Sequence, residues 1–180
     1  AALYRKSAIG QVRFKEDLVI SEDRVFNYEV FRNCSRIAIT GQSWYRYFEN
    51  PESASQQMRE NAKAELIATA TAYEKLTEDC PEAVKDDIYR GIVECFMQTL
   101  EFTILREGFK RKFKVSKAQF VNELLSVGVY QRAFSSFQPH RTKEWVLKRL
   151  FEQRRPATIA AMYKLNRIIF DLKRGGVNRK

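Results

Sequence analysis

The chain has 180 residues, of which 44% are hydrophobic and 13% aromatic, so it has the composition of one folded domain rather than a disordered chain. Its net charge of +10 is uneven, because residues 1–105 sum to −4 and residues 106–180 to +14. Seven glycines and four prolines are few, which favours long helices over a sandwich of short strands. We expect no membrane span, since no apolar run reaches ~18 residues, and no signal peptide.

Three widely spaced cysteines, Cys34, Cys80 and Cys95, indicate a reducing environment. They form neither an even-numbered disulfide framework nor a C-x-x-C metal motif. We therefore expect small buried side chains and a cytoplasmic protein.

Residues 1–48 are predicted to be an N-terminal arm packed on a helical bundle over residues 49–180. The apolar residues between positions 12 and 20 suit either a short strand or an extended segment. A helix is expected from Ser21, which precedes two acids, to Gly41. Alternation around Tyr28 also suits a strand, so the structure of the arm stays open. The aromatic residues of 44–48 are expected to pack as a satellite core, or alternatively to stack on bases.

Two long helices are predicted next, because Asn50-Pro51 and Cys80-Pro81 are both typical helix starts. The short connection between them predicts an antiparallel pair. The first helix has one apolar stripe, formed by Met58, Ala62, Leu66, Thr69, Tyr73 and Leu76. The second is apolar over a wider arc and is expected to be central. Its stripes are Val84, Ile88, Ile92, Cys95, Thr99 and Phe102, with Phe96, Leu100 and Ile104 beside them.

Shorter helices are predicted after Gly108. Ser116 and Gln119 have the spacing of a capping box. The buried face that follows it is Phe120, Val121, Leu124 and Leu125. A short helix over residues 129–137 is broken by Pro139. The predicted fold class is therefore all-α, a helical bundle of about five to six helices with the N-terminal arm.

Two further helices complete the predicted bundle. Thr142 is expected to cap the next helix. The cations expected on its outer, solvent-facing side are Lys148, Arg149, Arg154 and Arg155. Its inward side chains are expected to be Trp145, Val146, Leu150 and Phe151. The last helix runs from Pro156 to Gly175-Gly176, with a stripe of Ile159, Met162, Leu165, Ile169 and Leu172.

No residue pattern predicts catalysis, so we expect a protein that is not an enzyme and has no cofactor. The only histidine, His140, has no carboxylate or cysteine at metal-ligand spacing. No phosphate-binding glycine loop or nucleophile elbow occurs. The acid pairs Glu78-Asp79 and Asp86-Asp87 lie near a helix start and are best explained by the helix dipole.

The strongest functional signal is the basic stretch from Phe109 to Lys117, which holds five cations within eight residues and no acid. Further cations follow on the later helices. If folding gathers these cations on one face, they predict non-specific binding to a phosphate backbone. Solvated helix faces are the ordinary alternative, and an anionic membrane surface is less favoured. The residues expected to contact nucleic acid are Lys110, Arg111, Lys112, Lys114, Lys117, Arg141, Lys143, Lys148, Arg149, Arg154, Arg155, Lys164, Arg167, Lys173 and Arg174.

The paired helices over Asn50–Glu107, the basic turn Phe109–Lys117 and the tail from Thr142-Lys143-Glu144-Trp145 to Arg174-Gly175-Gly176 resemble a known family. They are similar to the small subunits of CRISPR effector complexes, specifically the helical C-terminal region of the type I-D large subunit. The resemblance implies copies lining a crRNA-guided complex, where they support the crRNA–target heteroduplex and the displaced single DNA strand. Its partners would be nucleic acid, other subunits and further copies of itself. The alternative is an adaptor bundle that docks on an acidic protein.

Overall fold

The structure, a computed structural model, describes residues 3–42, 61–105 and 108–165. Within these ranges every regular element is a helix, which confirms the predicted all-α class. The chain divides into two compact units, Ala1–Gln57 and Met58–Lys180. The aromatic residues of 44–48 lie outside the described residues, as does the predicted helix start at Asn50-Pro51.

The first unit is built around α2 (Glu22–Arg32), with the short α1 (Lys6–Ile9) packed against it. The Phe26 ring stacks on Phe14 at 4.2 Å and meets the edge of Tyr4 at 5.8 Å. The helix ends at Arg32, so the prediction that it continues to Gly41 is wrong. The apolar residues Ile37 and Ile39 beyond it are exposed and find no core that would stabilise another turn.

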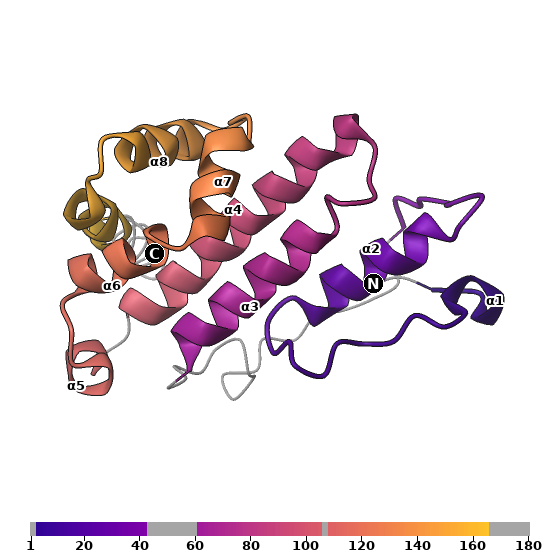
Figure 1. Cartoon of the computed structure of the whole chain (residues 1–180), viewed down its shortest axis with the longest axis horizontal. Coiled ribbons are helices and arrows are strands. Elements are labelled where there is room, and N and C mark those ends of the chain that lie inside the picture. Colours follow the sequence, from indigo (N-terminus) through magenta and orange to yellow (C-terminus); the bar gives the residue numbers. More distant parts are fainter. Residues whose placement is uncertain (1–2, 43–60, 106–107, 166–180) are drawn as a thin grey trace, which may run out of the picture. The chain divides into compact units, whose positions relative to one another are not determined.

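The second unit is centred on α4 (Glu82–Ile104), which lies antiparallel beside α3 (Ala62–Lys75) (Figure 1). The described residues of both predicted apolar stripes are largely buried. Cys95 lies in this buried face of α4, whereas Cys34 and Cys80 are partly exposed. Gly91 permits the close approach of the two helices, because a Cβ there would lie 3.0 Å from Cε1 of Tyr73.

The basic stretch forms a helix, α5 (Phe109–Phe113), rather than the turn that was expected. Its phenylalanine rings pack on Phe120 of α6 (Lys117–Leu125), with centroids 5.3 Å away for Phe109 and 5.0 Å for Phe113. The predicted cap of α6 is present, since Ser116 Oγ accepts a hydrogen bond from Gln119 N at 3.1 Å. All four residues of its predicted apolar face are buried.

Helix α7 (Gly128–Ser136) crosses α4 and completes the core (Figure 1). Phe96 of α4 packs against Tyr130 and Phe134, with ring centroids 5.2 and 5.3 Å apart. The Tyr130 hydroxyl donates to Leu66 O at 2.9 Å, so one buried side chain joins α7 to α3.

Helix α8 (Thr142–Glu152) turns a different face to the core than predicted. Leu147 is buried, whereas Trp145 is 60% exposed and Val146 44% exposed, so the prediction that these two point inward is wrong. The Phe151 ring stacks on Phe134 of α7 at 4.6 Å, which fixes the helix by its 147/151 side. Residues 156–165 are also helical and bury Ile159 and Tyr163.

Candidate nucleic-acid interface

Five cations gather on and beside α5, and we call them the α5 cation cluster: Lys110, Arg111, Lys112, Lys114 and Lys117. The first three are consecutive residues of α5, Lys114 ends the helix and Lys117 begins α6. Lys110, Arg111 and Lys114 are exposed, and Lys112 and Lys117 are half-buried. Phe109 is buried at the Phe120 ring, so the aromatic side of the helix faces α6, and Lys110, Arg111 and Lys114 are left exposed.

No acid occurs between Gly108 and Asn122, and the acids on either side of this stretch in the sequence are Glu107 and Glu123. The next carboxylate, Glu123, already accepts a hydrogen bond from Lys63 Nζ at 2.7 Å. The hydrogen bond with Lys63 is the main reason that the pKa of Glu123 lies below its usual value. The positive potential of the cluster is therefore concentrated on a small surface.

Three other predicted cations, Arg141, Lys143 and Lys148, make contacts inside the molecule. The guanidinium of Arg141 lies 3.9 Å from Glu94 of α4, and Lys143 lies 4.0 Å from Glu101. Such long, exposed pairs contribute little stability, which leaves both side chains able to exchange partners. Lys148 has a structural role, since its Nζ donates to Phe137 O at 2.7 Å, at the end of α7.

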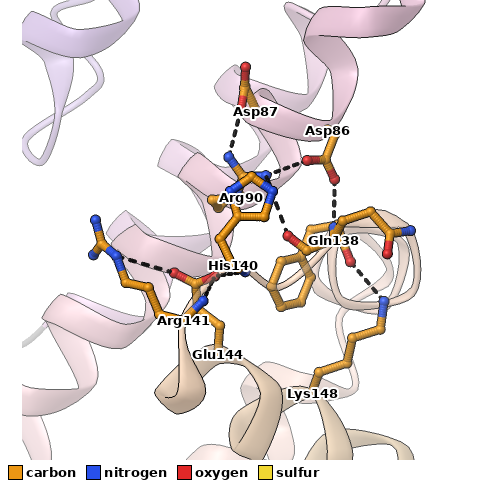
Figure 2. Close-up of polar contacts among 9 residues, drawn as sticks. Asp86, Asp87, Arg90, Gln138, His140, Arg141, Glu144 and Lys148 are labelled. Carbon is orange, nitrogen blue, oxygen red and sulfur yellow. Dashed lines mark hydrogen bonds and ion pairs between the residues drawn. The ribbon is translucent and has the colours of Figure 1, made fainter.

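A polar cluster between α4 and the segment before α8 anchors that segment (Figure 2). Arg90 forms ion pairs with Asp86 and Asp87 and also contacts Gln138 O at 3.3 Å. A second Arg90 contact runs from its guanidinium to Nε2 of His140, 2.9 Å away. Because a guanidinium only donates, that nitrogen accepts, which assigns the proton of a neutral imidazole to Nδ1.

These contacts replace the helix-dipole explanation of the acid pair Asp86-Asp87. Sequence reasoning missed Arg90, although its spacing of three and four residues from the two acids is a usual signal for ion pairs on a helix. The contacts of Arg90 with Gln138 and His140 join residues about fifty positions apart, so no local sequence pattern predicts them.

Glu144 fixes the first turn of α8 from inside the protein. Its side chain is only 1% exposed, and Oε2 accepts hydrogen bonds from the backbone nitrogens of His140 at 2.8 Å and Arg141 at 3.3 Å. The N-cap residue is therefore Arg141 rather than the predicted Thr142, with the third helical residue supplying the acceptor. This cap and the Arg90 contacts together set which side of α8 faces solvent.

The remaining described cations follow α8. Arg149, Arg154, Arg155 and Lys164 are exposed and form no ion pair with a described residue. In Figure 1, α8, the helix over 156–165, α6 and α5 follow one another along one edge of the second unit. The two helices at the ends of this edge, α5 and α8, are thus not adjacent. Arg167, Lys173 and Arg174 lie outside the described residues.

Comparison with known proteins gives no relative from which a role for these residues could be transferred. No protein-family model, no curated protein and no solved structure matches the chain. Across residues 3–42, 61–105 and 108–165, no group of three or more metal-ligating side chains comes together. None of the helices in these ranges combines the length and hydropathy that crossing a membrane requires.

Proposed function

We propose that this chain is a helical subunit that binds nucleic acid without sequence preference, through the α5 cation cluster and the exposed arginines of α8 and its exit. The observation that carries the proposal is the cluster itself: five cations in eight residues, with no acid between Gly108 and Asn122. Phosphates bound there would release condensed counterions, which is the main source of non-specific affinity.

The packing of α5 favours a phosphate backbone, rather than a lipid membrane, as the partner of its cations. Phe109 is buried and Phe113 packs on Phe120, so the helix offers cations but no apolar face that could insert among lipids. Flexible cations on a five-residue helix suit the backbone of a nucleic acid better than base edges, which need a longer element in a groove.

The resemblance to type I-D small subunits supports a place in an RNA-guided ribonucleoprotein in the cytoplasm. There the chain would support the crRNA–target heteroduplex and the displaced DNA strand by backbone contacts and would carry out no catalytic step itself. Other subunits, including further copies of this chain, would supply the remaining contacts.

Salt-dependent binding to a labelled, random-sequence 20-nucleotide single strand tests the proposal. Wild type should bind with a steep dependence of affinity on salt. Replacing Lys110, Arg111, Lys112 and Lys114 together by alanine should reduce the slope of log K against log salt by about 3. Fluorescence anisotropy at four salt concentrations measures both slopes.

A matched control removes the same charge elsewhere. Arg5, Lys6, Arg13 and Arg36 are exposed cations of the first unit, and their fourfold alanine variant should retain most of the wild-type slope. Equal slopes for the two fourfold variants would contradict a role for α5. Absence of wild-type binding at moderate salt would instead favour the adaptor that docks on an acidic protein.

A further inference from the structure

Helix α8 exposes a tryptophan to solvent, although a side chain of this kind is ordinarily buried in the core. Trp145 is 60% exposed and its neighbour Val146 44% exposed, while Leu147 takes the buried position beside them. An indole is the largest apolar side chain, and leaving it in water forgoes the stabilisation that burial would provide. The exposed ring therefore requires an explanation beyond packing.

Two arginines flank the ring on its own side of the helix. Arg141 and Arg149 lie four residues before and after Trp145, the spacing at which helical side chains are neighbours. The Arg141 side chain is 76% exposed despite its long contacts with Glu94 and Glu144. Arg149 is exposed and forms no ion pair within the described part of the chain. The face thus alternates cation, aromatic ring and cation.

The segment that carries this face is basic, and the acids of α4 that approach it are Glu94, 3.9 Å from Arg141, and Glu101, 4.0 Å from Lys143. Residues 141–165 hold seven lysines and arginines against two acids, Glu144 and Glu152. Glu144 is buried in the cap of α8 and does not face the partner, which leaves Glu152 as the exposed carboxylate of the helix. This charge balance complements a polyanion and disfavours a basic or neutral surface.

The face is also held in place before any partner arrives. The Glu144 cap fixes the first turn of α8, and Lys148 binds the end of α7 from the next turn. Phe151 stacks on Phe134 one turn later. A ring on a helix fixed at three points loses little freedom on binding.

We propose that Trp145 is a base-stacking platform that gives the chain a preference for single-stranded nucleic acid, with Arg141 and Arg149 holding the phosphates on either side. This inference rests on the proposed function and names its substrate class. Bases of a single strand expose their faces to an aromatic ring, whereas bases within a duplex are already stacked on one another. Stacking needs no base edges, so the platform would be tolerant of sequence.

The test compares three labelled 20-nucleotide probes in anisotropy titrations: oligo(dT), an abasic deoxyribose-phosphate strand of equal length, and a duplex. Wild type should bind oligo(dT) most tightly of the three. Trp145→Leu, which keeps an apolar side chain without an aromatic face, should weaken oligo(dT) binding by about 5- to 100-fold. The same change should alter binding to the abasic strand by less than about twofold.

Three further proteins make this result specific. Trp145→Phe keeps an aromatic face and should recover part of the lost affinity for oligo(dT). Val146→Ala removes an exposed apolar residue one position away and should leave all three affinities unchanged. In a Trp44→Phe protein, Trp145 is the only indole of the chain, and its fluorescence should be quenched by oligo(dT) but not by the abasic strand.

The outcomes separate this inference from the proposed function. Equal weakening of oligo(dT) and abasic binding by Trp145→Leu, or no weakening of either, overturns the platform. In that case the proposed binding to the phosphate backbone still stands if the salt slope depends on the α5 cation cluster. The fluorescence measurement decides the question if Trp145→Leu does not fold, since quenching by both strands or by neither overturns the platform. Failure of wild type to bind any of the probes overturns both proposals.

Discussion

At the scale of single residues, two of the predicted binding cations have an unusual backbone conformation. Lys114 at the end of α5 has φ +55°, and Arg154 after α8 has φ +51°. This left-handed region disfavours side chains with a Cβ, and glycine is the usual residue there. A cation at such a position is better explained by its charge than by its contribution to folding.

Replacing Lys114 by glycine should therefore separate stability from binding. The variant should be more stable by about 0.5–1 kcal/mol, because glycine relieves the positive φ at the end of α5. It should also lose one phosphate contact, which reduces the salt slope on a single strand by about 0.7. Urea denaturation and anisotropy measure the two effects.

Lys114→Ala is the matched control, since alanine removes the charge but keeps the Cβ. Its salt slope should fall as in the glycine variant, while its free energy of unfolding stays near that of wild type. A glycine variant less stable than the alanine variant would show that the backbone of Lys114 is not strained.

At the scale of elements, the orientation of α8 depends on a few long-range contacts. The buried carboxylate of Glu144 accepts two backbone hydrogen bonds at the start of the helix, and a charged acceptor of this kind contributes more than a neutral one. The same cap holds the backbone of His140, which Arg90 connects to α4.

Glu144→Ala should lower the free energy of unfolding by about 1.5–3 kcal/mol, because two donors lose a charged acceptor in a buried place. Glu144→Gln keeps one carbonyl oxygen and should lose less. Urea denaturation followed by circular dichroism measures both changes. Glu152→Ala, at the exposed end of the same helix, should change stability by less than about 0.5 kcal/mol. Similar losses at positions 144 and 152 would argue against the buried cap.

The packing of α3 and α4 could be predicted from the sequence, whereas the facing of α8 could not. Each long helix repeats its apolar residues over several turns, so only one face fits the core. In α8 the apolar residues spread over a wide arc, and Trp145 and Leu147 compete for the same core. Contacts with Phe134, seventeen residues before Phe151, decide between them. The five residues of α5 are too few for any period to show.

The residue composition of the candidate interface could be predicted from the sequence, but the ion pairs that its cations form could not. The basic half of the chain is visible from charge alone, and its densest stretch forms the α5 cation cluster. The pairing of Arg141 with Glu94 and of Lys143 with Glu101 joins residues more than forty positions apart. Spacing along a helix reports only neighbours three or four residues away, so these pairs leave no sequence signal.

At the scale of the whole molecule, two buried tyrosines make stability depend on alkaline pH. Burial is the main cause that raises the pKa of Tyr130 in α7 and of Tyr163 in the last described helix. Both groups hold their protons in the folded state at a pH where the unfolded chain releases them, near pH 10. Their contribution is therefore complete below that pH and is lost as the pH rises.

The free energy of unfolding should fall above pH 10 by about 1.4 kcal/mol per pH unit for each tyrosine. Urea denaturation between pH 8.5 and 11 measures this slope. In a Tyr130→Phe, Tyr163→Phe double variant the slope above pH 10 should be smaller, because phenylalanine does not ionise. The double variant should also have a lower free energy of unfolding at neutral pH, since it lacks the hydrogen bond from Tyr130 to Leu66 O. An unchanged slope would show that both hydroxyls ionise freely in the folded protein.

Because Cys95 is buried on α4, the reaction of its thiol can report when the core around this helix opens. Cys34 and Cys80 are partly exposed and should react with an alkylating reagent in the native protein, whereas Cys95 is covered on α4. Its thiol becomes accessible only when the residues packed over α4 move away. The alkylation rate at Cys95 without denaturant would therefore follow the rare opening of the core, and no foreign label would be needed to observe it.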